Sequence, residues 1–113
     1  MLVSVDKKTC RLLDGIKTTF DLSETELARL FGVERASLSG WREHGIPSAR
    51  RASVERLAEL ARIFDRELIP SRIPEIVRTA DAWLDNRTIL QTIQRDGVDP
   101  IYAYLHRLFN YAG

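Results

Sequence analysis

Apolar residues recur every three or four positions along most of this chain, and this spacing limits the possible folds more than any other feature. The longest apolar stripe falls within 48–68 and consists of Val54, Leu57, Ala58, Ala61, Phe64 and Leu68. Residues at such spacing share one face of an α-helix, because one helical turn takes about 3.6 residues. No run of alternating apolar and β-branched residues is long enough for a sheet. The sequence therefore predicts an all-α fold.

The size of the chain suits one compact unit or two subdomains that share a boundary. It has 113 residues, 44% of them hydrophobic, which is enough to form a core. Pro70 and Pro74 interrupt the helical pattern after residue 68. We therefore expect helical subdomains at 1–68 and 69–113, with the boundary near 69–73.

Capping residues and helix breakers divide the pattern into separate helices. Ser23 and Glu26 have the spacing of a capping box, and Gly32 ends that helix as a glycine free to adopt positive φ. Asp99 and Pro100 suit an N-cap followed by the first helical position, where the missing amide hydrogen of proline is harmless. Further helices are expected at about 9–19, from 34 or 35 to 44, and at 48–68, 88–96 and 100–112, with a short helix or turns at 74–84.

The segment 23–44 meets the requirements of a helix-turn-helix. Its apolar residues are spaced so that two short helices share a small core: Leu27, Phe31, Val33, Leu38 and Trp41. Ala28 is small where the helices cross closely, and Gly32 permits a tight turn. We therefore expect 35–44 to be a DNA recognition helix.

A projection of this helix at about 100° per residue predicts its DNA-facing residues. Leu38 and Trp41 fall on the inner side. The residues expected to contact DNA are Arg35, Ala36, Ser37, Ser39, Gly40 and Arg42. Arginine can bond guanine or phosphate, serine can bond several base edges, and an alanine methyl can touch thymine.

Gly40 is an unusual residue for the middle of a helix, where glycine costs about 1 kcal/mol relative to alanine. Close approach of the sugar-phosphate backbone would account for it. The alternative is that Gly40 merely lowers the stability of the helix and that the fold tolerates this cost.

Basic residues concentrate near this segment, although the net charge of the chain is only +1. Arg50 and Arg51 begin the helix 48–68, whose N-terminal amides favour an anion. We assign both to phosphate contacts. The alternative for them is surface pairing with Glu43 or Glu55, and the alternative for the local excess of charge is an ordinary solvated surface.

The sequence lacks the features of enzymes, metal proteins and membrane proteins. Cys10 is the only cysteine, so no internal disulfide can form, and no apolar run reaches the roughly 18 residues of a membrane span. Neither His44 nor His106 has a second ligand at metal-binding spacing. No phosphate loop, nucleophile motif or catalytic carboxylate pair is present. We therefore expect a cytoplasmic protein with no catalytic activity, metal or cofactor.

Two sets of residues follow known family patterns. Gly32-Val33, Trp41 and the Gly-Ile-Pro at 45–47 resemble the Xre/Cro class of helix-turn-helix repressors. The second set lies in the tail and consists of Trp83, Leu84, Thr88, Ile89, Leu90, Ile93, Gly97, Leu105, Leu108 and Gly113. This set is similar to the toxin-binding domain of Xre/MbcA/ParS-type antitoxins. That family commonly has Gly-Gly where this chain has Asp85-Asn86.

The resemblance implies an antitoxin that silences a RES-domain toxin, an enzyme that consumes NAD, and that represses its own operon. It also implies a homodimer within a larger toxin–antitoxin complex that binds double-stranded operator DNA. In this family the C-terminal segment, here 110–113, is directed at the active site of the toxin. The residues that could form this interface are Tyr102, His106, Arg107, Asn110, Tyr111 and Gly113.

Other readings of the tail stay open at this point. The exposed residues of the last helix could form an ordinary amphipathic surface. The chain could also be a Cro-like repressor whose C-terminal part only makes a dimer, or an interaction module whose helix-turn-helix has lost DNA binding.

Overall fold

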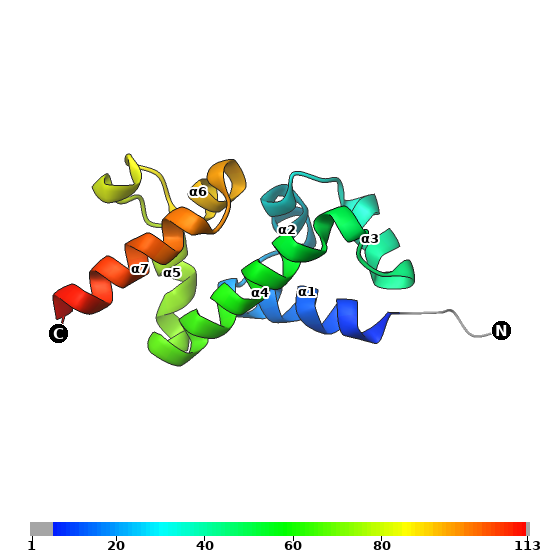
Figure 1. The fold of residues 1–113 in the computed structure, drawn as a ribbon, viewed down its shortest axis with the longest axis horizontal. Helices are drawn as coiled ribbons and strands as arrows, with labels where there is room; N and C mark the ends of the chain where they lie inside the picture. Colours follow the sequence, from blue (N-terminus) through cyan, green and yellow to red (C-terminus); the bar gives the residue numbers. More distant parts are fainter. Residues whose placement is uncertain (1–5, 113) are drawn as a thin grey trace.

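Helices make up most of the chain in the computed structural model, which describes the backbone of residues 6–112 and the side chains of residues 6–109. Within this part, the chain forms seven α-helices, two short 3₁₀ turns and no strand (Figure 1). The elements are α1 (Lys7–Phe20), α2 (Glu24–Phe31), α3 (Arg35–His44), α4 (Ser48–Glu67), η1 (Pro70–Arg72), α5 (Ile73–Val77), η2 (Ala82–Leu84), α6 (Ile89–Asp96) and α7 (Asp99–Ala112). The predicted all-α class is confirmed.

Side-chain caps set the ends of the early helices. The Ser23 hydroxyl accepts a hydrogen bond from the Glu26 amide at 3.0 Å, and the Glu26 carboxylate accepts one from the Ser23 amide at 2.9 Å. Gly32 follows α2 with φ 67, in the left-handed region. The predicted capping box and glycine stop are therefore confirmed. Asp6 caps α1 by accepting from the Thr9 amide, so this helix begins earlier than predicted.

The core extends through the whole length of the described chain. Side chains with no solvent exposure are Leu13, Ile16, Phe20, Leu27, Leu38, Val54, Leu60, Phe64, Ile73, Val77 and Ile101. The rings of Phe20 and Phe64 meet edge to face, with centroids 5.3 Å apart, where α1 packs against α4. Leu60 is buried although it falls outside the predicted stripe of α4, because helices contact that face as well.

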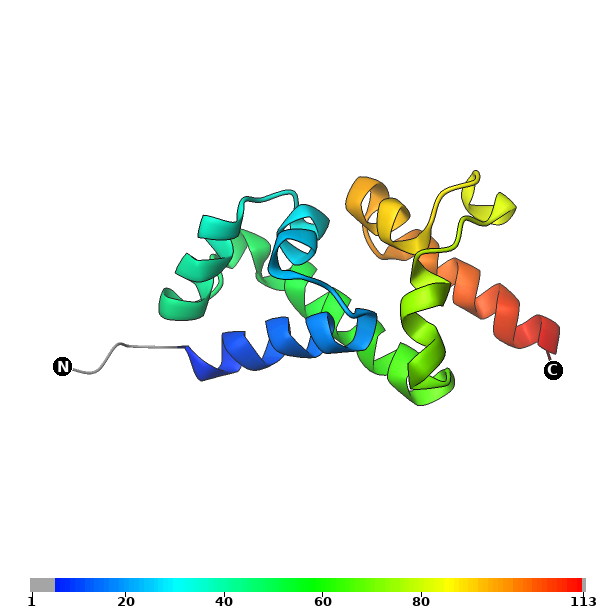
Figure 2. The same cartoon turned by 180° about the vertical axis from the view of Figure 1, so that it is seen from behind.

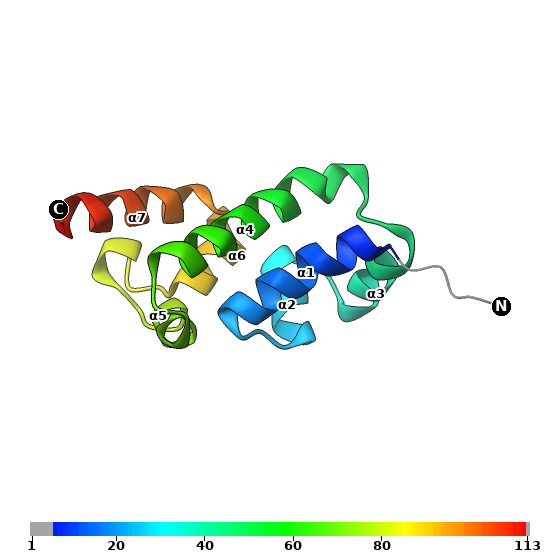
Figure 3. The same cartoon turned by 90° about the horizontal axis from the view of Figure 1, so that it is seen from below.

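The C-terminal elements pack directly on the first helices. Helix α5 contacts α1, and α6 contacts α2. The molecule is elongated, with extents of 54 × 24 × 22 Å. Figures 2 and 3 show that α3 and α7 lie at opposite ends of the long axis. None of the described helices is both long and apolar enough to cross a membrane.

Arg78 connects the end of α5 to α1 and α2. Its Nη1 donates to the carbonyl oxygens of Phe20 at 2.8 Å and Pro74 at 3.0 Å. Its Nη2 donates to the Asp21 carbonyl at 2.7 Å and the Glu26 carboxylate at 3.4 Å. Carbonyl groups at a helix C-terminus lack intrahelical partners, and a guanidinium has enough donors to satisfy several of them. One side chain therefore joins α5, the end of α1 and the cap of α2.

A tight turn connects η2 to α6. Asp85 has φ 58 and Asn86 has φ 62, and the Arg87 amide donates to the Leu84 carbonyl at 3.1 Å. Two successive positive φ values define a turn that suits glycine best, and aspartate and asparagine tolerate this conformation better than most other residues. Asp85-Asn86 can thus adopt the backbone that a Gly-Gly pair would adopt at this place.

Two details of the last helix differ from the prediction. Asp99 lies inside α7 rather than at its N-cap; the Val98 carbonyl accepts the first hydrogen bonds of the helix, and the Asp99 carboxylate pairs with Arg56 of α4. The helical spacing of Ile101, Tyr104, Leu105 and Leu108 predicts that they share one buried side, yet Leu108 is 42% exposed. The reason is that the last turns of α7 extend to the end of the molecule (Figure 1).

Candidate nucleic-acid interface

Helices α2 and α3 are two short helices joined by a tight turn, at the place where the sequence predicts a helix-turn-helix. The turn is fixed by the Gly32 amide, which donates to the Arg29 carbonyl, and the Val33 amide, which donates to the Ala28 carbonyl, each at 3.0 Å. The shared core consists of buried Leu27, Leu38 and Trp41 with partly buried Phe31 and Val33. The rings of Phe31 and Trp41 are in contact, with centroids 5.8 Å apart.

The outer face of α3 is small and polar. Arg35, Ala36 and Ser39 are exposed, whereas Ser37 and Gly40 are half-buried. A methyl group added at Gly40 would meet no atom within 4 Å. Arg35 forms no ion pair with any residue in the described part of the chain. Its guanidinium donors therefore stay available to a ligand.

Arg42 does not lie on this exposed face, in contrast to the prediction. Its Nε and Nη2 donate to the two carboxylate oxygens of Glu24, each at 3.0 Å, and its Nη1 donates to Asp14 at 2.9 Å. The Arg42 side chain is only 19% exposed. The reason is the pair of acids on the neighbouring helices: Glu24 of α2 and Asp14 of α1 hold the guanidinium against α1 and α2.

The Glu24 carboxylate has two cationic neighbours. Lys17 Nζ of α1 lies 3.2 Å from it, in addition to the Arg42 guanidinium. The hydrogen bonds from Arg42, with a smaller contribution from Lys17, lower the pKa of Glu24, and the same bonds raise the pKa of Arg42. Glu24 therefore stays ionised at neutral pH, and the cluster joins α1, α2 and α3.

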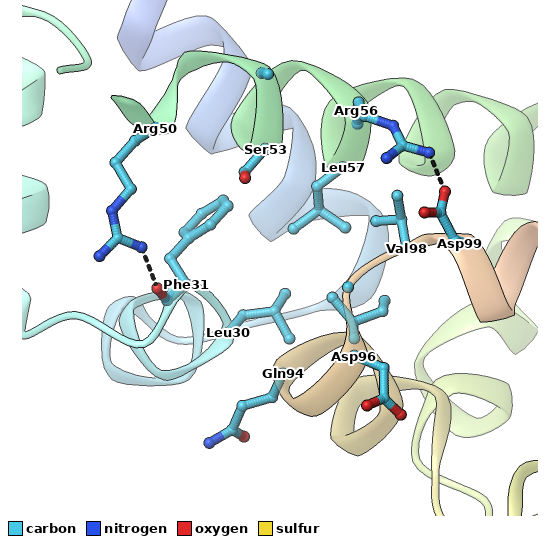
Figure 4. A pocket seen from close by; sticks show the side chains of 13 residues that line it. Leu30, Phe31, Arg50, Ser53, Arg56, Leu57, Gln94, Asp96, Val98 and Asp99 are labelled. Carbon is cyan, nitrogen blue, oxygen red and sulfur yellow. Dashed lines mark hydrogen bonds and ion pairs between the residues drawn. The ribbon is translucent and has the colours of Figure 1, made fainter. Parts of the chain in front are cut away.

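Arg50 and Arg51 are both exposed at the start of α4, as the phosphate-contact assignment requires. Arg50 Nη1 donates to the Phe31 carbonyl at 2.9 Å (Figure 4), and Arg51 Nη2 donates to the Ile46 carbonyl at 3.5 Å. Within the described residues neither Arg50 nor Arg51 pairs with Glu43 or Glu55, and Glu43 lies instead beside His44, so the alternative of surface pairing for these two arginines is not observed.

Sequence reasoning missed Arg29 as a candidate contact. This exposed residue of α2 lines a shallow hollow of about 320 Å³ together with Arg35 of α3 and Gln94 of α6. The position of Arg29, two residues after buried Leu27, is a weak signal of outward orientation. The approach of α6 to this hollow could not be seen in the sequence.

A cavity of about 360 Å³ lies between α2, α4 and the segment that joins α6 to α7 (Figure 4). Its lining includes apolar side chains of Leu30, Phe31, Leu57 and Val98. The pair between Arg56 and Asp99 lies at its edge, as shown in Figure 4. Its lining mixes charged and apolar side chains and contains no group of acids or bases arranged for catalysis. We therefore interpret it as a gap where packed elements meet.

A second exposed surface lies at the other end of the molecule. We define the aromatic patch as Trp83, Arg107, Leu108 and Phe109. Trp83 is 43%, Leu108 42% and Phe109 38% exposed. The Arg107 guanidinium lies 5.3 Å from the centroid of the Trp83 ring, and Trp83 contacts the ring of Tyr104 at 5.6 Å.

The predicted partner-binding residues differ in exposure and in their surroundings. Arg107 lies in the aromatic patch, and His106 is exposed on the same helix. Tyr102 is half-buried, and burial together with the charge of Glu59 on α4 raises its pKa. The side chains of Asn110 and Tyr111, and all of Gly113, lie outside the described residues. Trp83 was missed as a site residue because its position beside α7 depends on the fold of 78–88.

No protein-family model, curated protein or solved structure matches this chain. Within the described residues, no three His, Cys, Asp or Glu side chains gather where they could hold a metal ion.

Proposed function

We propose that this chain is a DNA-binding antitoxin that binds operator DNA through α3 and a toxin through the aromatic patch. One observation carries the DNA-binding part: α3 buries Leu38 and Trp41 against the helix-turn-helix core, and its opposite face is exposed. A helix of this kind fits the DNA major groove, which is wide enough to accept one α-helix.

The chemistry of the exposed residues supports nucleic acid as the ligand. Arg35 and Ser39 offer donors for base edges, and Ala36 offers a methyl group. Arg29, Arg50 and Arg51 flank this face and would neutralise phosphates. Phosphate contacts would set the register of α3, and the base contacts would give sequence preference.

The aromatic patch supports a protein as the second ligand. Tryptophan and arginine are the residue types that most often dominate binding energy at protein interfaces. Here the Arg107 guanidinium lies over the Trp83 ring, and the next two residues of α7, Leu108 and Phe109, are exposed apolar side chains. We propose a RES-domain toxin as the occupant, following the sequence resemblance of the tail. The patch and α3 lie at opposite ends, so both ligands can bind at once (Figure 2).

A second candidate function follows from the same patch. If two copies of this chain cover it, the protein is a Cro-like repressor with a C-terminal dimer contact. A dimer suits DNA recognition, because one short helix reads few base pairs.

Fluorescence anisotropy tests the DNA-binding part, with a duplex that carries the sequence upstream of the coding region. The double variant Arg35→Ala/Ser39→Ala should weaken binding by at least about 30-fold, because each of two good base contacts contributes roughly 1–3 kcal/mol. Arg66→Ala is the matched control: it lies near the far end of α4, exposed and paired with Glu67. Equal affinity of wild type and double variant would refute the proposed face.

Co-expression with the neighbouring gene product separates the two candidate functions. An antitoxin should copurify with that product in a complex of defined mass. A Cro-like repressor should give a homodimer, and substitution Phe109→Asp should convert it to a monomer. A wild-type chain that is monomeric and binds no neighbour would contradict both.

A further inference from the structure

We propose that Arg42 is a positioning residue of α3, which holds the recognition helix at a fixed angle through Glu24 and Asp14 instead of contacting DNA. This inference rests on the proposed function in so far as it concerns DNA affinity. Its structural part, the coupling of Arg42 to the other two helices, can be tested without any DNA.

The guanidinium of Arg42 uses most of its donors on protein groups. Nε and Nη2 meet both oxygens of Glu24 on α2, and Nη1 meets Asp14 on α1. A bidentate pair of this kind fixes distance and orientation together. A side chain bonded in this way has little capacity left for a base or a phosphate.

The backbone of Arg42 is also an anchor. Its carbonyl accepts from the Asp6 amide at 2.8 Å, and Cys10 Sγ lies 3.8 Å from the same oxygen. These contacts attach the N-terminal end of α1 to the last turn of α3. Arg42 thus connects three helices through its side chain and main chain.

Helix α3 needs such an anchor because few of its side chains are buried. Only Leu38 and Trp41 are buried among its described residues. Two buried side chains give the helix few packing contacts that define its rotation, so a third contact on another part of the helix adds to that definition. Arg42 follows Arg35 by seven residues, about 20° short of two full turns, and so lies on nearly the same side of the helix. Fixing Arg42 therefore fixes the direction in which Arg35 points.

The charge of Glu24 gives a test in which the two interpretations predict opposite signs. Glu24→Gln removes a negative charge and frees Arg42. If Arg42 binds DNA, or if only long-range charge matters, this substitution should tighten binding to the upstream duplex. If Arg42 positions α3, it should weaken binding about tenfold, with the salt dependence unchanged.

Glu43→Gln is the matched control, because Glu43 is an exposed acid of the same helix with no bond to Arg42. Its affinity for the duplex should equal or exceed that of the wild type. Tighter binding by Glu24→Gln would overturn the proposal, and so would equal losses in both variants.

Amide hydrogen exchange keeps the test independent of DNA. In Glu24→Gln and in the milder Arg42→Lys, exchange should accelerate in α3 while the central turns of α4 keep wild-type protection. The double variant should lose no more protection in α3 than the stronger single variant, since both substitutions break the same contact. If the wild type binds no specific DNA, the proposed function fails, whereas unchanged exchange in α3 would overturn the positioning role itself.

Discussion

Helices α3 and α7 both present an exposed surface at an end of the molecule, yet the two surfaces differ in chemistry. The exposed side of α3 carries Arg35, Ala36 and Ser39, which are polar or small. The exposed end of α7 carries Leu108 and Phe109, with the Trp83 ring nearby. A hydrated, charged ligand suits the first surface, and an apolar protein surface suits the second.

The two ends also differ in how they are held. Helix α3 is fixed by a core and by the charged cluster around Arg42. The last turns of α7 extend past the buried part of the helix, which includes Ile101, Tyr104 and Leu105. The comparison teaches that the surface which a helix leaves exposed, polar in α3 and apolar in α7, depends on what its neighbours bury.

The largest expected effect comes from removing the core contact of α3. Leu38→Ala should lower the free energy of unfolding by about 2–5 kcal/mol, because Leu38 has no solvent exposure. Urea unfolding measures this change. Leu108→Ala is the matched substitution at the exposed helix end and should cost less than about 1 kcal/mol. Equal costs would mean that the two ends are not packed differently.

The next effect concerns the aromatic patch. Trp83→Ala should weaken partner binding at least tenfold, as expected for an interface tryptophan, and should leave DNA affinity unchanged. Titration calorimetry with the copurified partner measures the partner affinity, and fluorescence anisotropy measures the DNA affinity. An unchanged partner affinity would remove the patch from the interface.

Alkaline pH should act mainly on the C-terminal end. The Tyr104 hydroxyl donates to Asp81 at 2.8 Å, and burial together with this bond raises the pKa of Tyr104 to about 12. Because the folded-state pKa is raised from 10.0, this stabilisation is complete below pH 10 and is lost as the pH rises from there through about 12. Tyr104→Phe should melt a few degrees lower at neutral pH.

The difference in melting temperature between wild type and Tyr104→Phe is the quantity to follow. It should shrink as the pH rises above 10. A constant difference up to pH 12 would show that ionisation of Tyr104 is not the cause.

The smallest expected effect separates the two explanations for Gly40. Gly40→Ala should stabilise the fold by about 1 kcal/mol, since no atom lies within 4 Å of the added methyl. If the DNA backbone approaches Gly40, this substitution should also weaken DNA binding. Gly15→Ala in α1 is the matched control, with the same open surroundings. Equal DNA affinity in both variants would leave Gly40 as a weak point of the helix only.

The helix-turn-helix could be predicted because its signals are local. Ser23 and Glu26 are three residues apart, and Gly32 acts on its own backbone. Hydrophobic spacing located α2, α3, α4 and α6 within a residue or two. Thr88 and Gln91 form a second capping box at the start of α6, and their three-residue spacing is again a local signal.

The rest depended on contacts between distant parts of the chain. Arg42 and Asp14 are separated by 28 residues, so no local pattern indicated that the guanidinium points inward. The helical projection gave the position of Arg42 around the helix, but it could not identify the acidic residues that accept its hydrogen bonds. Trp83 likewise gains its role only because Tyr104 and Arg107 lie beside it.

The bonds of Arg78 to Phe20, Asp21 and Glu26 have a consequence for dissecting this molecule. A gene fragment cut after codon 68 would lose the guanidinium that covers the carbonyl groups ending α1, together with the fully buried side chains of Ile73 and Val77. We expect such a fragment to aggregate. Any fragment designed to fold on its own should therefore keep Arg78 together with its acceptors Phe20, Asp21 and Glu26.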